Sequence, residues 1–432
     1  MSRVVVVGGG LGGMAVAARL AKTGHEVTLL ERSPDLGGAL GSVSEDGFTW
    51  DAGASYTLLP AVLRDLFRKT GRPLERELDL EPLELVREHR FEDDTTLALP
   101  SSRAGQLRAL EALEPGLGER WTAHVDSFTE DWEVLRQHYF EHPWQRATPP
   151  DAVRRRFDSR EMLHKRLRRT LKDERLRDLA TFPFLADGHD PRNVPAWMGL
   201  VAYLEQRFGT WHVPGGMARI AEVLGSRLTT RGVTVLLSTP ARDVVLREGR
   251  AVAVRTDAGD IEADEVVVAV DPRGLPALAP LVERTMPAIP PVVCHVGLEG
   301  EVPDLPHEVV LHGDPLLVVR TGGQAPEGRH AWTIHGRGKI AEDLLRALAR
   351  HRIDVRAQLV HRVDRSPREL VQQWGSSPLG VLWQGRGTVR ARLGPDTPIP
   401  HLHAAGAHAT PGAGLPFVGL SAALVAERIG PA

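Results

Sequence analysis

Apolar residues along the first thirty positions follow the pattern of two buried strands joined by a helix. Val4 to Val7 are four consecutive valines, which is typical of a parallel strand buried on both faces. A helical pattern follows from Leu11 to Ala21, and Glu26 to Leu30 predicts a second strand. The chain is therefore expected to open with a β-α-β unit.

Glycines occupy the turn between the first strand and the helix. Gly8, Gly10 and Gly13 have the G-x-G-x-x-G spacing of a dinucleotide-binding turn. In such a turn the first glycine permits the tight bend, the second lets the backbone approach a pyrophosphate, and the third lets the helix pack on the strand. The N–H groups and the positive dipole end of the helix then favour phosphates. A β-α-β unit that uses its glycines for packing alone is the alternative.

The residues that end the second predicted strand bear on the choice of dinucleotide. Glu31 stands near the spacing at which an acidic side chain accepts a hydrogen bond from an adenosine ribose hydroxyl. A carboxylate there would repel a ribose 2′-phosphate, which disfavours NADP. The adjacent Arg32 leaves NADP open.

Helical patterns dominate the next part of the chain. Amphipathic segments separated by Pro and Gly extend from Leu58 to about Phe208, with Ala61 to Lys69 and Trp121 to Phe140 as examples. We interpret this stretch as the first half of an inserted domain.

A basic segment lies within that helical stretch. Arg154 to Arg177 is dense in Arg and Lys, and Leu163, Leu167 and Leu171 share one helical face. Charge runs are usually solvated faces, which favours a helix packed on its domain by the leucines. A basic amphipathic helix on an anionic membrane surface is the alternative.

Alternating helix and strand patterns return after Met217. The spacing predicts a helix from Ala218 to Thr230 and a strand from Val233 to Leu237. Three short strand-like pieces with tight turns between Ala241 and Ile261 predict a β-meander. Ala263 to Pro272 predicts another buried parallel strand.

A second block with strand patterns extends from Arg273 to about Pro400. It contains three strand-like runs and one helical segment, at Val292 to Leu298, Val309 to His312, Pro315 to Arg320 and Ile340 to Arg350. The chain then shows one last strand to Ala407, a glycine loop, and a helix packed by Leu420, Leu424 and Val425.

Composition narrows the classes of function. At 432 residues the chain is too long for one ordinary core and predicts two domains. A net charge of −3 argues against a nucleic-acid partner. Cys294 is the single cysteine, which excludes an intrachain disulfide or a multi-cysteine metal site. Because Met1 to Arg3 lead straight into the first strand and no apolar run is long enough to cross a bilayer, we expect a cytoplasmic protein whose membrane contact would be peripheral.

Side-chain motifs for hydrolytic or metal catalysis are missing from the sequence. No Ser-His-Asp order, H-E-x-x-H, Walker loop or Cys-x-x-Cys can be assigned. His401 and His403 would share a strand face and could hold a metal, but other ligands are scarce around them, so no metal is expected. This pattern fits a bound cofactor that carries out the difficult chemical step.

Two further glycine-containing segments indicate a cofactor larger than a nicotinamide dinucleotide. Gly37 and Gly38 form a loop that again permits close backbone approach. A short predicted strand from Gly47 to Ser55 delivers Asp51 and Gly53 to its end. A large cofactor that lies along the strand ends, with its far ring over residues 53–55, would explain both segments.

These N-terminal elements resemble the signature of the flavin amine oxidase and phytoene desaturase superfamily. That signature is a glycine-rich turn, an acidic-basic pair, a Gly-Gly pair and an F-x-x-D-x-G strand, matched here by residues 8–13, Glu31-Arg32, Gly37-Gly38 and residues 48–53. One departure is Ala39, where desaturases commonly place Arg. Thr210 to Met217 also resembles the element that returns the family's chain to its nucleotide-binding domain.

The last part of the chain is similar to the G-A-x-x-x-P-G-A-G-x-P element of phytoene desaturases. The matching residues are Gly406, Ala407, Pro411, Gly412, Ala413, Gly414 and Pro416. The family's central Gly-Thr-His is His408-Ala409-Thr410 here, which puts the role of the family histidine in doubt. We expect His408 to be a loop histidine that hydrogen-bonds to backbone, with a role at the flavin as the alternative. A helix N-terminus at this place would stabilise the negative charge of reduced flavin.

The resemblance implies FAD as the cofactor and an α/β fold. The fold would be a Rossmann-like FAD-binding domain of the glutathione-reductase type, with a β-meander, plus an inserted α+β substrate domain. The FAD-binding domain would comprise residues 1–75, 210–275 and 395–432, and the substrate or membrane-facing domain residues 76–209 and 276–394. The implied cofactor-binding residues are Gly8, Gly10, Leu11, Gly12, Gly13, Glu31, Arg32, Gly38, Ala39, Gly53, Ala54, Ser55, Val244 (through its backbone on the adenine side), Gly406, Ala407, Gly414, Phe417 and Val418.

The resemblance also implies an activity. We expect an FAD-dependent oxidoreductase that desaturates an apolar isoprenoid such as a carotenoid: a hydride leaves an allylic C–H for flavin N5 and a vicinal proton is lost to a base that the sequence does not identify. A flavin amine or porphyrinogen oxidase is one alternative, although amine oxidases usually set aromatic rings around the amine. A polyene saturase or isomerase, and a non-catalytic flavoprotein that binds a lipid, are the others. The oligomeric state is left undetermined.

Overall fold

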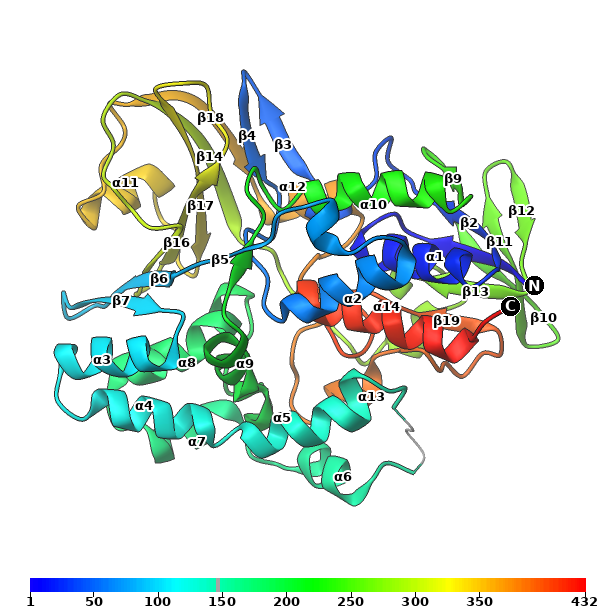
Figure 1. Cartoon of the computed structure of the whole chain (residues 1–432), viewed down its shortest axis with the longest axis horizontal. Helices are drawn as coiled ribbons and strands as arrows, with labels where there is room; N and C mark the ends of the chain where they lie inside the picture. The colour runs from blue at the N-terminus through cyan, green and yellow to red at the C-terminus, as the bar shows by residue number, and fades with distance from the viewer. Residues whose placement is uncertain (145–147) are drawn as a thin grey trace.

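The computed structural model of the chain describes residues 1–144 and 148–432. At its centre β1 (Arg3–Val7) lies in a five-stranded parallel sheet of order β19-β13-β1-β2-β9. The other strands are β2 (Glu26–Leu30), β9 (Thr234–Leu236), β13 (Glu265–Val268) and β19 (Leu402–Ala404). Strands about 260 residues apart, such as β1 and β13, thus hydrogen-bond side by side, and both termini lie at the same end of the molecule (Figure 1).

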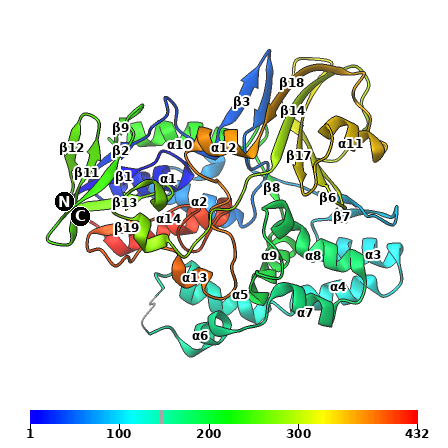
Figure 2. The same cartoon turned by 180° about the vertical axis from the view of Figure 1, so that it is seen from behind.

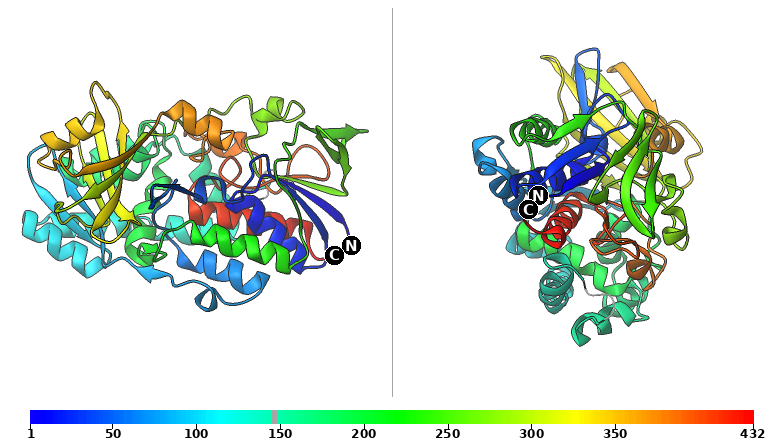
Figure 3. Two further views of the ribbon diagram at one scale, coloured as in Figure 1. Left: turned by 90° about the horizontal axis from the view of Figure 1, so that it is seen from above. Right: turned by 90° about the vertical axis from the view of Figure 1, so that its right-hand side faces the viewer.

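The four valines of β1 are buried because both faces of this sheet are covered. Val4 and Val6 pack with α1 (Leu11–Lys22), α2 (Pro60–Thr70), α10 (Arg219–Thr230) and α14 (Leu415–Ile429). Val5 and Val7 pack in a second cluster with the three-stranded meander β10 (Asp243–Arg247), β11 (Arg250–Thr256) and β12 (Gly259–Glu262). Figure 3 shows the helices stacked on one face, and Figure 2 shows the meander beyond the sheet. The predicted β-α-β unit and meander are confirmed.

Gly13 lets α1 pack directly against the turn that follows β1, because it has no side chain. A Cβ atom at this position would lie 1.8 Å from the carbonyl oxygen of Gly8. The third glycine of the turn therefore has the packing function that its spacing predicts.

We expect Gly13→Ala to lower the free energy of unfolding by about 3 kcal/mol, because the helix must shift away from the turn to admit a methyl group. Chemical denaturation followed by circular dichroism measures the change. Gly225→Ala in α10 is the matched control, since its Cβ would lie 3.6 Å from Leu36. That variant should be neutral or slightly stabilising. Equal stability of the two variants would contradict this assignment.

A second, seven-stranded sheet lies beside the parallel sheet and is formed by strands from residues 85–100 and 292–365. Its order is β18-β14-β17-β16-β15-β6-β7. In chain order its strands are β6 (Leu85–Arg90), β7 (Thr96–Pro100), β14 (Val292–Glu299), β15 (Glu308–Leu311), β16 (Leu316–Gly323), β17 (Arg329–Arg337) and β18 (Leu359–Arg365). The three strand-like runs predicted between residues 292 and 320 are all present.

The prediction of helical segments throughout residues 58–208 is confirmed at its start by α2, but it is wrong for residues 81–100, which form strands. β6 and β7 form a hairpin, and β6 pairs in parallel with β15, some 220 residues further along the chain. Arg87 and His89 lie buried on β6, so its polar residues do not mark a solvent face. The period-2 pattern on which a strand prediction depends is therefore hidden.

Helices do form the remainder of that region, below the seven-stranded sheet in Figure 1. They are α3 (Arg103–Leu113), α4 (Leu117–Asp126), α5 (Thr129–Leu135), α6 (Asp151–Asp158), α7 (Leu163–Thr170), α8 (Glu174–Ala186) and α9 (Leu200–Phe208). Leu163, Leu167 and Leu171 are at most 1% exposed within the core of this layer. The leucine stripe packs inward, as the first interpretation expected, and is not available to a lipid surface.

Shorter elements complete the chain. They are the hairpin β3 (Ser42–Glu45) and β4 (Phe48–Asp51), the pair β5 (Glu81–Pro82) and β8 (Trp211–His212), and the helices α11 (Leu344–Arg350), α12 (Pro367–Trp374) and α13 (Thr388–Ala391). α11 begins later than predicted because the Asp343 side chain caps it by accepting from the backbone N–H groups of Leu345 and Arg346. Within the described residues, no helix is both long and apolar enough to cross a membrane.

Candidate functional site

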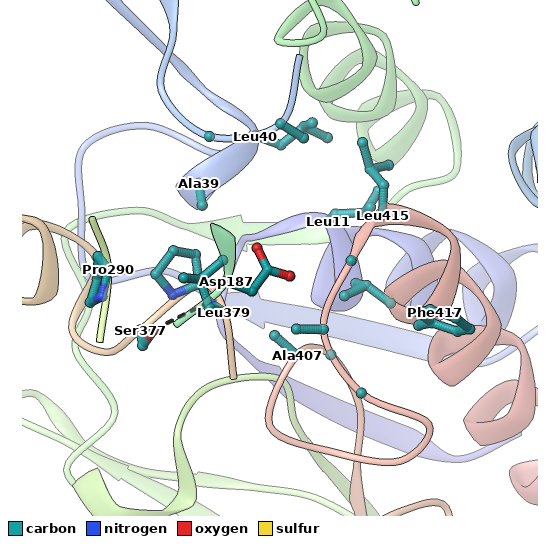
Figure 4. A pocket seen from close by; sticks show the side chains of 18 of the residues that line it. Leu11, Ala39, Leu40, Asp187, Pro290, Ser377, Leu379, Ala407, Leu415 and Phe417 are labelled. Atoms are coloured by element: carbon teal, nitrogen blue, oxygen red, sulfur yellow. Dashed lines mark hydrogen bonds between the residues drawn. The ribbon is translucent and has the colours of Figure 1, made fainter. Parts of the chain in front are cut away.

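Three distant stretches of the chain meet around one cavity of about 470 Å³ (Figure 4). The stretches are the turn after β1, the segment from Glu31 to Leu58, and the loop from Gly406 into α14. Sixteen residues singled out from the sequence line this cavity: Gly8, Gly10, Leu11, Gly12, Glu31, Arg32, Gly38, Ala39, Gly53, Ala54, Ser55, Gly406, Ala407, Gly414, Phe417 and Val418. Residues that the sequence could only relate by motif are therefore neighbours in space.

The glycine turn leaves room for a bulky group at the N-terminus of α1. Gly10 is the residue before the helix, and in the described part of the chain no side chain caps the first turn. A Cβ at Gly10 would meet only the Gly37 carbonyl oxygen, 4.0 Å away, so the space in front of it is open. A Cβ at Gly12 would lie 2.9 Å from the Cα of Gly406, which brings the last stretch of the chain against the first. This cradle fits a pyrophosphate, because helix N–H groups and bare backbone face the same space.

Glu31 and Arg32 hold the wall beyond the turn. The Glu31 carboxylate accepts hydrogen bonds from the backbone N–H groups of Gly9, at 2.7 Å, and Ser33, at 2.8 Å. Arg32 also lines the cavity and donates to the carbonyl oxygens of Gln372 and Gln373, at 2.6 and 2.5 Å, at the end of α12. Glu31 is therefore oriented at the cavity, and Arg32 fixes α12 beside it.

Gly13 and Val244 do not line this cavity. Gly13 is used in packing against Gly8, as described above. Val244 is 3% exposed on β10 and packs with Val5 and Val254. Its backbone contact with an adenine group stays a prediction.

The cavity extends beyond the glycine cradle toward the seven-stranded sheet and the helices beside it. Its walls there are mostly apolar and aromatic: Phe140, Phe182, Phe184, Trp197, Met198, Val201, Leu316, Val318, Leu379 and Trp383. These residues come from helices α8 and α9, strand β16, the short helical segments at residues 136–140 and 196–199, and the loop after α12. Sequence reasoning missed all of them, because only a hydrophobic pattern marks their segments and that pattern does not distinguish a cavity wall from a core.

A buried network of ions stands beside Tyr56 at the cavity wall. Arg87 donates to Glu205, at 2.6 Å, and to Glu308, at 2.9 Å, while Arg320 donates to Glu308 at 3.0 Å. Arg320 also donates to the Gly53 carbonyl oxygen at 2.9 Å. The two arginines hold the pKa of Glu308 below its usual value despite its burial. The network thus ties the second sheet to the predicted flavin segment.

Histidines in the cavity wall are uncharged at neutral pH. Burial lowers the pKa of His408 to about 4 and that of His189 to about 3, and it also lowers the pKa of His335 well below its usual value. The Nε2 of His408 lies 3.3 Å from the carboxylate of Asp271, whereas the sequence analysis expected a backbone partner. The two histidines considered for a metal, at positions 401 and 403, each contact the carboxylate of Glu265.

A parallel sheet with a β-meander on one face and a glycine cradle at its strand ends defines a dinucleotide-binding oxidoreductase fold. The chain belongs to the family of flavin containing amine oxidoreductases, whose model matches residues 11–430. This membership confirms the predicted fold class, the oxidoreductase class and the cofactor, FAD.

Two relatives align with about two thirds or more of this chain. A 4,4′-diapolycopene oxygenase of a Methylomonas species is 27% identical over 328 residues, which is 72% of this chain and 66% of the relative. A 4,4′-diapophytoene desaturase (4,4′-diaponeurosporene-forming) of Staphylococcus aureus strain COL is 26% identical over 301 residues, which is 67% of this chain and 58% of the relative. The matched stretches therefore span less than two thirds of these relatives.

Solved structures agree on the fold. Cyclohexylamine oxidase from Brevibacterium oxydans superposes with a TM-score of 0.67 at 17% identity, and 99% of each chain is covered. The likeness extends over both the parallel sheet and the seven-stranded sheet.

Proposed function

We propose that this chain is an FAD-dependent dehydrogenase that desaturates an apolar isoprenoid such as a carotenoid. The observation that carries the proposal is the continuity of one cavity from the glycine cradle into walls of aromatic and aliphatic side chains. Such walls favour a long hydrocarbon over a polar substrate. The names of the two relatives, a diapolycopene oxygenase and a diapophytoene desaturase, support the same class of substrate.

The proposal assigns the sixteen cavity-lining residues to FAD. The pyrophosphate would lie at Gly10 and the N-terminus of α1, and the adenosine ribose at Glu31. The flavin ring would lie between residues 53–55 and the N-terminus of α14, which begins at Leu415. The positive end of that helix would then stabilise negative charge on the ring.

When bound, FAD supplies the acceptor for a hydride from the substrate. The protein must supply position and exclude water. The apolar walls do both, since they surround the hydrocarbon and offer water few polar partners. The polyene itself delocalises the positive charge that develops when hydride leaves.

We also propose that the protein takes this apolar substrate from a membrane surface. Met286 and Ile289 are 52% and 63% exposed although both are apolar. They lie just before Pro290 and Pro291, which line the cavity. A lipid surface against these side chains would lead an apolar substrate to the cavity. The cytoplasmic location stays a prediction from the sequence.

Anaerobic mixing with candidate substrates tests the function. We expect liposome-borne phytoene, lycopene or a hydroxylated carotenoid to bleach the visible flavin absorbance, and primary amines and polyamines to leave it unchanged. Bleaching by amines alone would overturn the proposal in favour of an amine oxidase. Flavin reduction by porphyrinogens would indicate a porphyrinogen oxidase. Saturated or isomerised polyene products would indicate a saturase or an isomerase. Tight binding of polyenes without bleaching, with any acceptor, would indicate a lipid-binding flavoprotein.

A further inference from the structure

One carboxylate in the cavity wall has no function in the fold. Asp187 follows directly after α8 and lines the cavity in the substrate domain. Figure 4 shows its carboxylate directed into the cavity. Within the described residues, no hydrogen bond reaches either of its side-chain oxygens. A carboxylate that faces an apolar cavity without a hydrogen-bond partner lowers the stability of the fold. Such a group indicates a functional role in the cavity.

The other two carboxylates of the cavity wall are already occupied. Glu31 accepts from two backbone N–H groups at the dinucleotide end. Glu308 is 1% exposed and is paired with both Arg87 and Arg320. Neither carboxylate is available to take a proton from a substrate without breaking these contacts.

The basic residues of the wall do not compete as proton acceptors either. His189, His335 and His408 all have depressed pKa values and hold a proton weakly. The Tyr56 hydroxyl contacts Arg87 at 3.1 Å, and burial raises its pKa to about 12, so it stays protonated. Among the described residues of the wall, Asp187 is thus left as the acceptor.

Arg337 holds the turn that carries Asp187. Its guanidinium donates to the carbonyl oxygen of Ala186, the residue before Asp187, and to that of Ile289 at 2.7 Å. Gly188, the residue after, has φ of +79°, and a Cβ there would lie 2.7 Å from Arg337 Nη1. The turn is therefore pinned on both sides of the carboxylate, as a positioned group in a reaction requires.

We propose that the Asp187 carboxylate accepts the proton that the substrate loses during desaturation. This inference rests on the proposed function. One C–H bond of the substrate breaks with both electrons leaving as hydride to oxidised FAD, and the adjacent C–H breaks with its electron pair forming the new C=C bond. The proton from that second bond goes to an Asp187 oxygen and then to solvent. A dioxygen or quinone acceptor reoxidises the reduced flavin.

The surroundings of Asp187 suit this role at neutral pH. Burial raises its pKa to about 6, while the cations Arg337 on β17 and Arg320 on β16 oppose that rise and the anion Glu308 on β15 adds to it. The group is therefore a carboxylate at pH 7 with a higher proton affinity than an exposed aspartate. Rates that depend on it should rise as the pH rises through about 6 and then level off.

Stopped-flow flavin reduction by the polyene that bleaches wild-type enzyme tests the role. We expect Asp187→Asn to slow reduction about 100-fold and to lose the pH-dependent limb near 6, with unchanged flavin content and polyene affinity. Asp187→Glu should keep the limb and recover part of the rate. Asp190→Asn is the matched control, because Asp190 is exposed three residues further on, and it should react as wild type does. Reduction of Asp187→Asn at the wild-type rate, or a loss confined to polyene binding, would overturn the inference.

A second measurement needs no turnover. The pKa of Asp187 is about 6 in the folded state and near 4 in the unfolded chain. Its negative charge therefore destabilises the fold fully above about pH 6, and this cost disappears as the pH falls from 6 to 4. Asp187→Asn apoprotein should melt about 2 °C higher than wild type at pH 8, and the difference should shrink at pH 5. A constant difference would contradict a titrating Asp187. Failure of the proposed desaturase function would give a different result from failure of the Asp187 inference. In that case no polyene would bleach the flavin of the wild-type enzyme.

Discussion

Gly10→Val is expected to give a folded protein that purifies without FAD. The protein itself has room for the side chain, because a Cβ at Gly10 would meet only the Gly37 carbonyl oxygen at 4.0 Å, and φ of −74° is open to any residue. The isopropyl group would instead occupy the space assigned to the pyrophosphate. We expect FAD to bind at least about 100-fold more weakly, a loss of roughly 3 kcal/mol.

Flavin absorbance per protein and FAD titration of the apoprotein measure this effect, and circular dichroism checks the fold. Gly274→Val is the matched control, because a Cβ there would meet nothing within 4 Å and the residue is exposed. That variant should retain full flavin. A yellow Gly10→Val protein with wild-type flavin content would show that the pyrophosphate lies elsewhere.

Arg87→Ala is expected to cost about 3–5 kcal/mol of stability, the largest effect of any single substitution considered. The change would leave Glu205 and Glu308 buried without their shared cation, and side chains that are 9% and 1% exposed cannot recover hydration. Tyr56 would lose its partner as well. Because the network reaches Gly53 through Arg320, the flavin segment should loosen with it.

Chemical denaturation of the apoprotein, with FAD affinity measured alongside, checks the result. Arg242→Ala provides the comparison: its ion pair with Asp257 joins two side chains that are more than half exposed. Loss of such a pair costs at most about 1 kcal/mol. Similar destabilisation by the two variants would mean that the buried network is not a principal support of the fold.

The parallel sheet and its meander could be predicted from sequence because their information is local. Four valines in a row indicate burial on two faces, and the structure covers those faces with helices on one side and the meander on the other. Turn glycines and short β-branched runs marked the remaining strands. Each of these features can be identified within about ten residues of chain.

The strand pair β6 and β7 could not be predicted in this way. Arg87 and His89 lie inside because Glu205, Glu308 and His312 compensate them across more than a hundred residues. No local pattern shows that a charged residue has a buried partner. A polar strand with distant partners therefore has the sequence pattern of a surface segment.

The candidate site also has one part that local sequence motifs predict and another part that only tertiary packing brings together. Motifs of glycine, acid and proline identified residues that line one end of the cavity, which we assign to the dinucleotide because bare backbone there can approach a ligand. The proposed substrate end is lined by Asp187, Arg337 and apolar side chains that no motif connects, because helix α8 and strand β17 meet only through tertiary packing. The specificity of this fold therefore lies in contacts that a single sequence does not display.

The pairing of α1 with α14 has a consequence for how the protein is made. The first helix of the chain packs on a helix that ends at Ile429, and Gly12 lies against Gly406 between them. While a ribosome is still translating the middle of the message, one wall of the cradle does not yet exist. With the cradle assigned to FAD as proposed, cofactor loading follows synthesis of residues 406–418, and the growing polypeptide has to stay competent for assembly until then.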